Sequence, residues 1–303
     1  MKIIFNYLIF PGFLFSAVIG LLAGWVDRKV TARIQWRRGP PWYQNFIDIV
    51  KLLGKETIVP EGAKFTFLLS PYFGVLSLSL VAAMLGKSII NPLEGFLGDL
   101  IVIIYLLVIP AIAMILGGSA SRNPLASIGV SREMKLVLAY ELPFILSIIA
   151  IIIKSDGAIE IGQIVNHQIN YGANIASISG ILAFVTAILC MQAKLGFVPF
   201  DASEAEQEIM AGVLIEYSGL PLALFKLTKA IMLYTMPLFL IVLFLAKDLS
   251  PLFLIAKYIG ILVVIILIKN TNPRLRIDQA LKFFWRIPTL LAIIAVVLAF
   301  LGY

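Results

Sequence analysis

The chain is poor in charge, cysteine and histidine, and each shortage excludes a class of protein. Charged residues make up 14% of its 303 positions, whereas 61% are hydrophobic. A soluble domain carries roughly 25% charged residues, so a compact soluble protein of this composition could not cover its surface with charge. The composition excludes a soluble enzyme, a disordered chain and a nucleic-acid binder. We therefore expect a polytopic helical membrane protein embedded in a lipid bilayer.

The single cysteine, Cys190, and the single histidine, His167, limit the chemistry that the chain can perform. One cysteine excludes a disulfide framework, a zinc site and a four-cysteine iron–sulfur cluster. One histidine removes most metal sites and most histidine-based proton relays. The Gly-x-x-x-x-Gly-Lys-[Ser/Thr] motif is absent, so direct driving by ATP is unsupported. We expect this chain to bind no metal and no cofactor.

Several long apolar stretches have the length of a transmembrane helix. There are eight of them, at residues 3–26, 65–86, 99–117, 136–153, 173–194, 221–245, 252–269 and 287–303. The alternating pattern of a membrane β-barrel is absent. The sequence therefore predicts an all-α integral membrane protein with about eight transmembrane helices, forming a single domain over 1–303 without a soluble domain.

Lysine and arginine are divided unevenly between the connections. Sixteen of the 24 lie in the connections 27–64, 118–135, 194–220 and 270–286, and only four lie in the connections on the other side. By the positive-inside rule, the basic loops are expected in the cytoplasm and both termini outside. The predicted location is the plasma membrane, with multiple spans.

The longest basic loop, 27–64, contains an amphipathic pattern after Gly39-Pro40-Pro41. Polar residues recur there at helical spacing, and apolar residues fill the other face, which predicts a helix lying at the cytoplasmic interface of the membrane. The polar residues of this loop are either ordinary positive-inside charge or a docking platform for a cytoplasmic partner. The candidate docking residues are Arg37, Arg38, Gln44, Asp48, Lys51 and Lys55.

One glutamate, Glu141, falls inside the span expected at 136–153. An ionisable group in a span is costly and is a functional candidate by default. Pro143 removes a backbone hydrogen bond to the carbonyl of Ala139, and a buried carboxylate beside loosened backbone suits a proton-conducting site. The alternative is a structural carboxylate paired with Arg132 or with a lysine of another span.

A second acidic feature lies in the connection 194–220, where five carboxylates occur within sixteen residues without a basic residue among them. They are Asp201, Glu204, Glu206, Glu208 and Glu216. Part of this pattern has a structural explanation, because Ser203 and Glu206 match a capping box and Glu204 would favour a helix N-terminus. Like charges this close favour protonation of some members, which makes the segment a candidate for proton or ion coupling.

Two further candidates have weaker patterns. The last basic loop carries Arg274, Arg276 and Asp278, and is either an ordinary anchored loop or a basic counterpart of the acidic segment. Asp99 opens the span 99–117, where it is either an interfacial helix-start carboxylate or a participant in proton movement.

These groups, in this order, resemble the membrane subunit shared by respiratory complex I (its subunit 1) and the energy-converting membrane-bound NiFe hydrogenases. The matching stretches are RRGP…QNFIDIVKLLGKE, SREMKLVLAYELP, GFVPFDASEAEQEIMAGVLIEYSG and NPRLRIDQALKFFW. The glutamate of SRE, Glu133, is similar to the hydrogenase-type subunits, since complex I subunits usually have glutamine there. The stretch GGSASRNPLASIG also resembles formate hydrogenlyase subunit 4 and the M-type subunit of the archaeal membrane-bound hydrogenase.

The resemblance implies a non-catalytic subunit that anchors a peripheral arm and couples its redox reaction to ion translocation. The implied partners are hydrogenase-like large and small subunits and a ferredoxin-like subunit on the cytoplasmic side, with antiporter-like subunits in the membrane. Iron–sulfur clusters and the NiFe centre would then belong to the partners. Carried over residue by residue, the resemblance implies ion coupling by Glu141, Asp201, Glu204, Glu206, Glu208 and Glu216, and docking by Arg37, Arg38, Asp48, Lys51, Arg274, Arg276 and Asp278. Glu133 and Asp99 complete the set of candidate coupling residues.

Three alternatives stay open on the sequence. The chain could be the quinone-site subunit of a complex I-like NADH or F420H2 dehydrogenase, or the matching subunit of a related sulfur-reducing complex. A free-standing secondary transporter is more distant, because such transporters often show inverted repeats and no convincing internal repeat is present.

Overall fold

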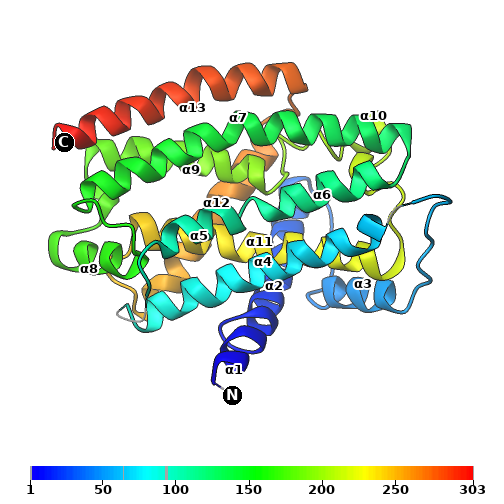
Figure 1. Ribbon diagram of the computed structural model, residues 1–303, viewed down its shortest axis with the longest axis horizontal. Coiled ribbons are helices and arrows are strands. Elements are labelled where there is room, and N and C mark those ends of the chain that lie inside the picture. The colour runs from blue at the N-terminus through cyan, green and yellow to red at the C-terminus, as the bar shows by residue number, and fades with distance from the viewer. Residues whose placement is uncertain (1, 64, 93–94, 303) are drawn as a thin grey trace.

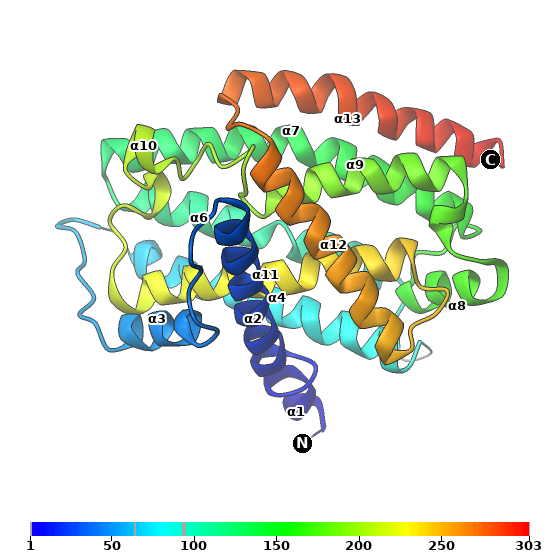
Figure 2. The same cartoon turned by 180° about the vertical axis from the view of Figure 1, so that it is seen from behind.

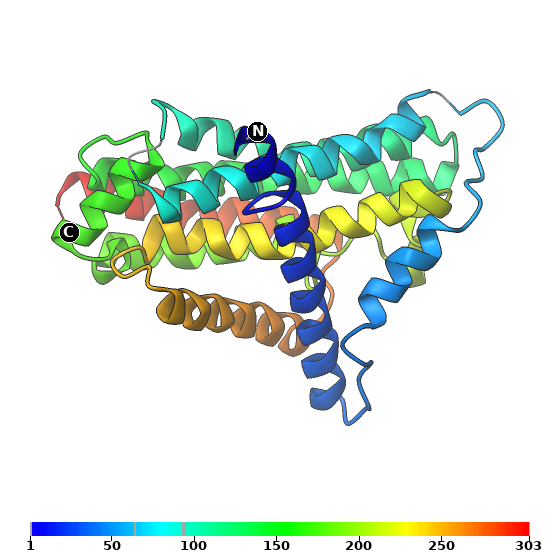
Figure 3. The same ribbon diagram turned by 90° about the horizontal axis from the view of Figure 1, so that it is seen from below.

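The computed structural model describes residues 2–63, 65–92 and 95–302, and all of the regular structure in these ranges is helical (Figure 1). The longer helices run along one axis of an elongated bundle, while α2 and α12 cross it obliquely (Figures 2 and 3). The elements are α1 (Lys2–Leu8), α2 (Phe13–Ile34), α3 (Gln44–Leu53), α4 (Phe65–Ile90), α5 (Asp99–Leu106), α6 (Ile109–Ala120), α7 (Pro124–Lys154), α8 (Ile161–Tyr171), η1 (Asn174–Ala176), α9 (Ile178–Lys194), α10 (Glu206–Ile209), η2 (Gly212–Leu214), α11 (Gly219–Phe244), α12 (Pro251–Thr271) and α13 (Ile277–Phe300).

The expected all-α membrane fold is confirmed. In the described part of the chain, seven helical segments are long and apolar enough to cross a membrane, and α9 is a shorter apolar helix. Two of the seven are interrupted: α1 and α2 form one segment, and α5 and α6 form another. The amphipathic helix predicted in the first basic loop is present as α3.

Helix α11 occupies the centre of the bundle. Of its most apolar 18-residue window, 89% is buried, and it packs against α2, α3, α4 and α12. Small residues allow this close packing, as is common between membrane helices. A Cβ atom at Gly20 of α2 would lie 2.1 Å from the carbonyl oxygen of Ala230, and one at Gly74 of α4 would lie 2.9 Å from Cγ2 of Thr228. The crossings of α2 and α4 with α11 therefore depend on glycine.

Helices α12 and α13 lie at the periphery. Only 22% and 28% of their apolar windows are buried, and large apolar side chains such as Leu252 and Phe300 are exposed. In water so much exposed apolar surface would be unfavourable, whereas in a bilayer it contacts lipid or another membrane subunit. The peripheral helices thus agree with a membrane location.

Several helices are longer than their apolar stretches. Helix α2 continues to Ile34, and α7 already begins at Pro124, directly after Asn123, whose side chain caps it by accepting a hydrogen bond from the Leu125 N–H. Helix α13 begins at Ile277. Consequently Glu133 and other charged residues that we expected in loops lie on helices instead.

The connection after α7 also differs from expectation, because it contains the helix α8. The side chain of Gln168 in α8 donates hydrogen bonds to the carbonyls of Val242 and Leu243. These are among the last carbonyls of α11, which lack partners within their own helix. Helix α8 therefore caps the C-terminal end of the central helix α11. The sequence of α8 mixes polar and apolar residues, so it does not stand out as an apolar stretch.

The basic loops gather toward one end of the bundle, here called the basic end. The connection 54–63 lies there with α3 and α10, and the connections 35–43, 195–205 and 272–276 lie between that end and the middle of the bundle. Helix α8 and the C-terminal end of α13 lie at the opposite end (Figures 1 and 2). This arrangement brings together the candidate residues of the first basic loop, the acidic segment and the last basic loop.

Candidate functional site

A buried ion pair joins α7 and α9. Lys194 is the last residue of α9, and its ammonium lies 2.5 Å from Oε2 of Glu141 in the middle of α7. The Lys194 side chain is 1% exposed, and its ammonium also lies 5.1 Å from the ring centre of Tyr140 and 4.7 Å from that of Phe144. Both rings present their electron-rich faces to the cation. Glu141 is therefore paired with a lysine of another helix, which is the alternative that the sequence left open.

The second carboxylate oxygen of Glu141, Oε1, is buried and accepts no hydrogen bond within the described residues. A buried acceptor without a partner is costly, and it favours an arriving donor or proton. The pair therefore combines a held cation with a carboxylate oxygen that has no hydrogen-bond donor among the described residues.

The acidic segment 201–216 is not a cluster of unpaired like charges, so that part of the expectation is wrong. Each carboxylate whose side chain the structure describes has a partner from another segment. Asp201 pairs with Arg274 through two hydrogen bonds of 2.8 and 2.5 Å. The other pairs are Glu204 with Lys229, Glu208 with Arg132, and Glu216 with Asn123. Arg274 therefore makes the last basic loop a basic counterpart of the acidic segment, which is one of the two interpretations that the sequence left open.

Glu206 opens α10, but its side chain is outside the described part of the structure, and so is the predicted capping interaction with Ser203. Ser203 instead lies close to the side chain of Glu133, and both residues line the same small cavity. Glu133 is 7% exposed and lies on α7, eight residues before Glu141. Eight residues of an α-helix span about 12 Å, so Glu133 and Glu141 lie about that far apart along the axis of α7.

A small cavity lies between these groups. Its volume is about 20 Å³, and its polar lining comes from Glu133, Lys194, Ser203, Glu204 and Lys229. A cavity of this size has room for about one water molecule. The ion pair Glu141–Lys194 is thereby joined, through the cavity, to Glu133 and to the ion pair Glu204–Lys229. This series of residues is here called the polar chain.

Asp99 lies apart from the polar chain, at the opposite end of the bundle. It is 3% exposed, and its Oδ1 accepts a hydrogen bond of 2.8 Å from the N–H of Ile161, the first residue of α8. Burial makes a charge on Asp99 energetically unfavourable, and the hydrogen bond that Asp99 accepts at the N-terminus of α8 offsets part of this cost. Asp99 is therefore both the first residue of α5 and a hydrogen-bond acceptor for the first residue of α8.

The candidate docking residues fall into two groups. Gln44, Asp48 and Arg274 are engaged within the chain, since Gln44 donates to Asp48 at 2.8 Å, Arg28 lies 3.4 Å from Asp48, and Arg274 holds Asp201. The other group is exposed at the basic end and consists of Arg37, Arg38, Lys51, Lys55, Arg276 and Asp278. The exposed group is the part that a partner could contact.

Sequence reasoning missed the cations of the polar chain. Lys194 falls at the start of the basic connection 194–220, and Lys229 falls inside the span expected at 221–245. A third missed pair joins Asp27 of α2 to Lys269 of α12 at 2.7 Å, with Lys269 also 4.7 Å from the ring centre of Phe197. Lysines inside apolar spans were the available signal, because such residues mark functional sites as readily as glutamates do.

Comparison with known proteins places this chain in a family. The family model described as NADH dehydrogenase matches residues 6–300. Hydrogenase-4 component C of Escherichia coli (strain K12) is 34% identical over 202 residues, which cover 66% of this chain and 63% of that protein. An NADH-quinone oxidoreductase subunit of Geobacillus sp. (strain WCH70) is 31% identical over 286 residues, covering 88% and 84%.

A solved structure has the same fold over nearly the whole length. It belongs to the membrane-bound sulfane sulfur reductase, an archaeal respiratory membrane complex, with a TM-score of 0.88 and 30% identity over 99% of this chain and 100% of that one. The protein is a membrane subunit of the kind found in complex I-like and hydrogenase-like complexes. The chain belongs to the NADH dehydrogenase family.

Proposed function

We propose that the chain anchors and couples a multisubunit, redox-driven ion pump, in particular a membrane-bound NiFe hydrogenase. The observation that supports this role is the polar chain, which runs from the loop region of the basic end to Glu141 within α7. Ion pairs between separate segments are expected where charge must be passed between a surface and the interior of a membrane.

The polar chain suggests how charge would move. Lys194 contacts Glu141 and also lines the cavity that Glu133 and Glu204 line. If Lys194 turns from Glu141 toward the cavity, Glu141 is left as an uncompensated buried carboxylate and takes up a proton. The return of Lys194 releases that proton. A change of charge near Glu204 or Asp201, caused by a redox event in a docked partner, would drive this exchange.

The basic end would dock the peripheral arm. The exposed residues Arg37, Arg38, Lys51, Lys55, Arg276 and Asp278 would contact hydrogenase-like large and small subunits and a ferredoxin-like subunit. Those partners would carry the iron–sulfur clusters and the NiFe centre, since this chain has one cysteine and one histidine. Antiporter-like subunits would contact it within the membrane. With the basic end in the cytoplasm, both termini would face outward.

Two alternatives have specific support. A sulfur-reducing complex is favoured by the likeness to the sulfane sulfur reductase chain, which covers almost all of both chains. A quinone-site subunit of an NADH or F420H2 dehydrogenase is favoured by the 31% identity with the NADH-quinone oxidoreductase subunit of Geobacillus. A free-standing transporter has no such support. It would be supported only if the chain carried ions or solutes across a membrane without partner subunits.

Purification of the complex from its native membrane tests the proposal. We expect mass spectrometry to identify a large subunit with nickel-binding cysteines beside this chain, and inverted vesicles to pump ions when the complex evolves hydrogen. A large subunit without those cysteines, together with sulfur reduction or quinone reduction, would replace the hydrogenase by one of the alternatives.

A further inference from the structure

A second cavity, which shares only Lys229 with the polar chain, lies between α2, α3 and α11. Its volume is about 370 Å³, and it is lined along α2 by residues from Gly20 to Arg28, along α3 by Asn45, Asp48 and Ile49, and along α11 by residues from Lys226 to Leu233. We propose that it binds one membrane phospholipid with an anionic phosphodiester headgroup. The inference does not depend on which redox complex contains the chain.

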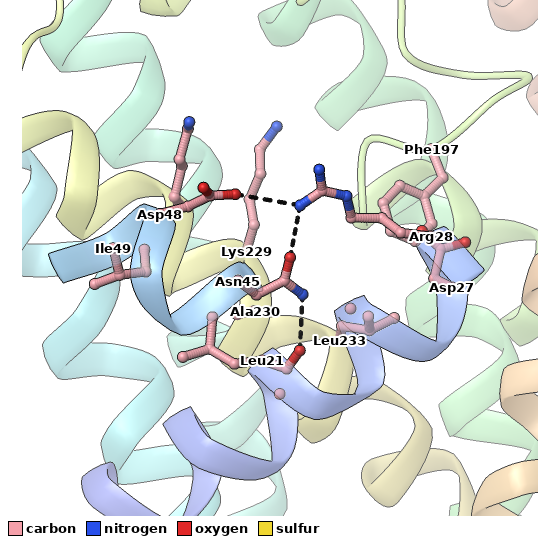
Figure 4. A pocket seen from close by; sticks show the side chains of 13 residues that line it. Leu21, Asp27, Arg28, Asn45, Asp48, Ile49, Phe197, Lys229, Ala230 and Leu233 are labelled. Carbon is pink, nitrogen blue, oxygen red and sulfur yellow. Dashed lines mark hydrogen bonds and ion pairs between the residues drawn. The ribbon is translucent and has the colours of Figure 1, made fainter. Parts of the chain in front are cut away.

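The cavity has a charged part and an apolar part. Figure 4 shows Asp48, Lys229 and Arg28 on one side, with Leu21, Ala230 and Leu233 on the other. Both α2 and α11 change from small or apolar residues to charged ones along the cavity, and they do so toward the basic end. A ligand that fills the whole cavity must therefore be amphipathic, with a polar head at the basic end.

The charged part has an excess of positive charge. Arg28, Lys226, Lys229 and the neighbouring Lys269 meet only three carboxylates, because Asp27 pairs with Lys269, Glu204 pairs with Lys229, and Asp48 accepts from Arg28. Lys226 is exposed and forms no ion pair or hydrogen bond with the described residues. One positive charge is left over, which matches the single negative charge of a phosphodiester.

Arg28 is held in place to receive this group. Asn45 of α3 accepts a hydrogen bond of 2.7 Å from the guanidinium, and its amide nitrogen donates to the carbonyl of Leu21 at 2.9 Å (Figure 4). The guanidinium keeps further N–H groups, and planar guanidinium groups suit phosphate oxygens. Arg28 thus offers the phosphate hydrogen-bond donors in a fixed orientation, and Lys226 offers it a positive charge on a mobile side chain.

The neighbourhood of α3 places the charged part at the level of lipid headgroups. Trp42 and Tyr43, just before α3, are 59% and 46% exposed, and Val50 on α3 is 66% exposed. Exposed Trp and Tyr are typical of the membrane–water interface. A soluble phosphate would leave the apolar part of the cavity empty, so a lipid fits better than a free anion.

Native mass spectrometry of the full chain, released from nanodiscs of equal phosphatidylglycerol and phosphatidylcholine, tests the inference. We expect the unmodified chain to retain one phosphatidylglycerol, and Lys226→Gln or Arg28→Gln to lower the retained fraction about five-fold, the effect of one basic residue on an anionic lipid. The matched control is Lys135→Gln, which removes an equally exposed lysine of α7 outside the cavity and should retain the lipid.

Competition identifies the source of the phosphate. Glycerol 1-phosphate carries the same charge without acyl chains and should not displace the lipid at millimolar concentration. The inference is overturned if glycerol 1-phosphate or inorganic phosphate displaces the lipid, if phosphatidylcholine is retained equally, or if Lys135→Gln weakens retention as much as Lys226→Gln. Displacement by a neutral isoprenoid quinone, to the same extent in the unmodified and Lys226→Gln chains, would also overturn it.

Discussion

The ammonium of Lys194, at the end of α9, lies 2.5 Å from Oε2 of Glu141, in the middle of α7, and its side chain is almost wholly excluded from solvent. The remaining oxygen of Glu141 is buried without a hydrogen bond from the described residues. A buried pair stabilises only while both members remain, since loss of one leaves an uncompensated charge. This dependence makes the pair a structural link between two helices, and under the proposed function it is also the place where a proton would be exchanged.

The first prediction concerns Lys194. Lys194→Met leaves Glu141 unpaired and should lower the free energy of unfolding by about 3–5 kcal/mol, as for other broken buried pairs. The double variant with Glu141→Gln removes both charges and should recover most of the stability, but it should not recover ion pumping. Thermal unfolding in nanodiscs measures the first effect and vesicle acidification the second. A double variant that pumps normally would contradict the role of the pair.

The second prediction concerns Glu141 alone. Glu141→Gln keeps the shape of the side chain and removes its ability to bind and release a proton. We expect it to abolish ion pumping by the assembled complex in vesicles, while the detached peripheral arm evolves hydrogen as before. The exposed carboxylate Asp156, in the connection after α7, provides the control, since Asp156→Asn changes one charge outside both the polar chain and the docking residues and should pump. Normal pumping by Glu141→Gln would refute the assignment.

The third prediction concerns the link between the acidic segment and the last loop. Asp201→Asn removes a two-point contact with Arg274 and should lower the free energy of unfolding by about 1–3 kcal/mol. Reversal of both charges, Asp201→Arg with Arg274→Asp, should regain part of that loss. Arg37→Gln, at an exposed position, should change stability by less than about 0.5 kcal/mol. If the reversed pair is no more stable than Asp201→Asn, the two residues do not interact as described.

The sequence was sufficient for the architecture, because apolar length and helical periodicity are local properties. All eight apolar stretches became helices, and the polar face of 44–55 predicted α3. Helix α8 was missed because it is shorter than a span and mixes polar with apolar residues; Ile161, Ile164 and Val165 recur at helical spacing, which a search for long apolar stretches does not detect. Its position depends on contacts such as that of Gln168 with the end of α11. A contact between segments far apart in the chain leaves no local pattern.

The sequence identified the carboxylates of the candidate site but not the basic residues that pair with them. Glu141 stood out because a charge within an apolar stretch is conspicuous, whereas Lys194 sits at a span boundary, where basic residues are common. The carboxylates of the acidic segment have no basic neighbour in the sequence, because the basic partners of three of them are distant: Arg132, Lys229 and Arg274 lie 76, 25 and 73 residues from Glu208, Glu204 and Asp201. Only the fold brings these charges together.

The fourth prediction concerns alkaline pH. Burial raises the pKa of Tyr217 from 10.0 to about 12, and its hydroxyl donates to the carbonyl of Phe67 at 3.0 Å. The folded state therefore keeps the proton that the unfolded state loses. This contribution to stability is complete below pH 10 and is lost as pH rises from about 10 to 12.

Tyr217→Phe removes this titration. Its stability at neutral pH should fall, because the buried carbonyl of Phe67 loses a donor, but it should lose less further stability between about pH 10 and 12 than the unmodified chain. Tyr43→Phe, at an exposed position, should follow the unmodified chain. Parallel stability curves for Tyr217→Phe and the unmodified chain over that range would contradict the prediction.

The fifth prediction tests whether the acidic segment must lie tightly on α7. A Cβ atom at Gly129 would lie 2.9 Å from the carbonyl oxygen of Ser203 and 2.8 Å from the backbone nitrogen of Val213, so Gly129→Ala must push the segment away from α7. Ser203 and Glu133 line the same cavity of the polar chain, and therefore the displacement should weaken ion pumping without removing any charge. Gly260→Ala is the matched control, because nothing lies within 4 Å of the added carbon on α12. There the better helix propensity of alanine should raise the free energy of unfolding by up to about 1 kcal/mol and leave pumping intact. If Gly129→Ala pumps as well as Gly260→Ala, the contact between the acidic segment and α7 is not needed for coupling, and the charges alone must be sufficient.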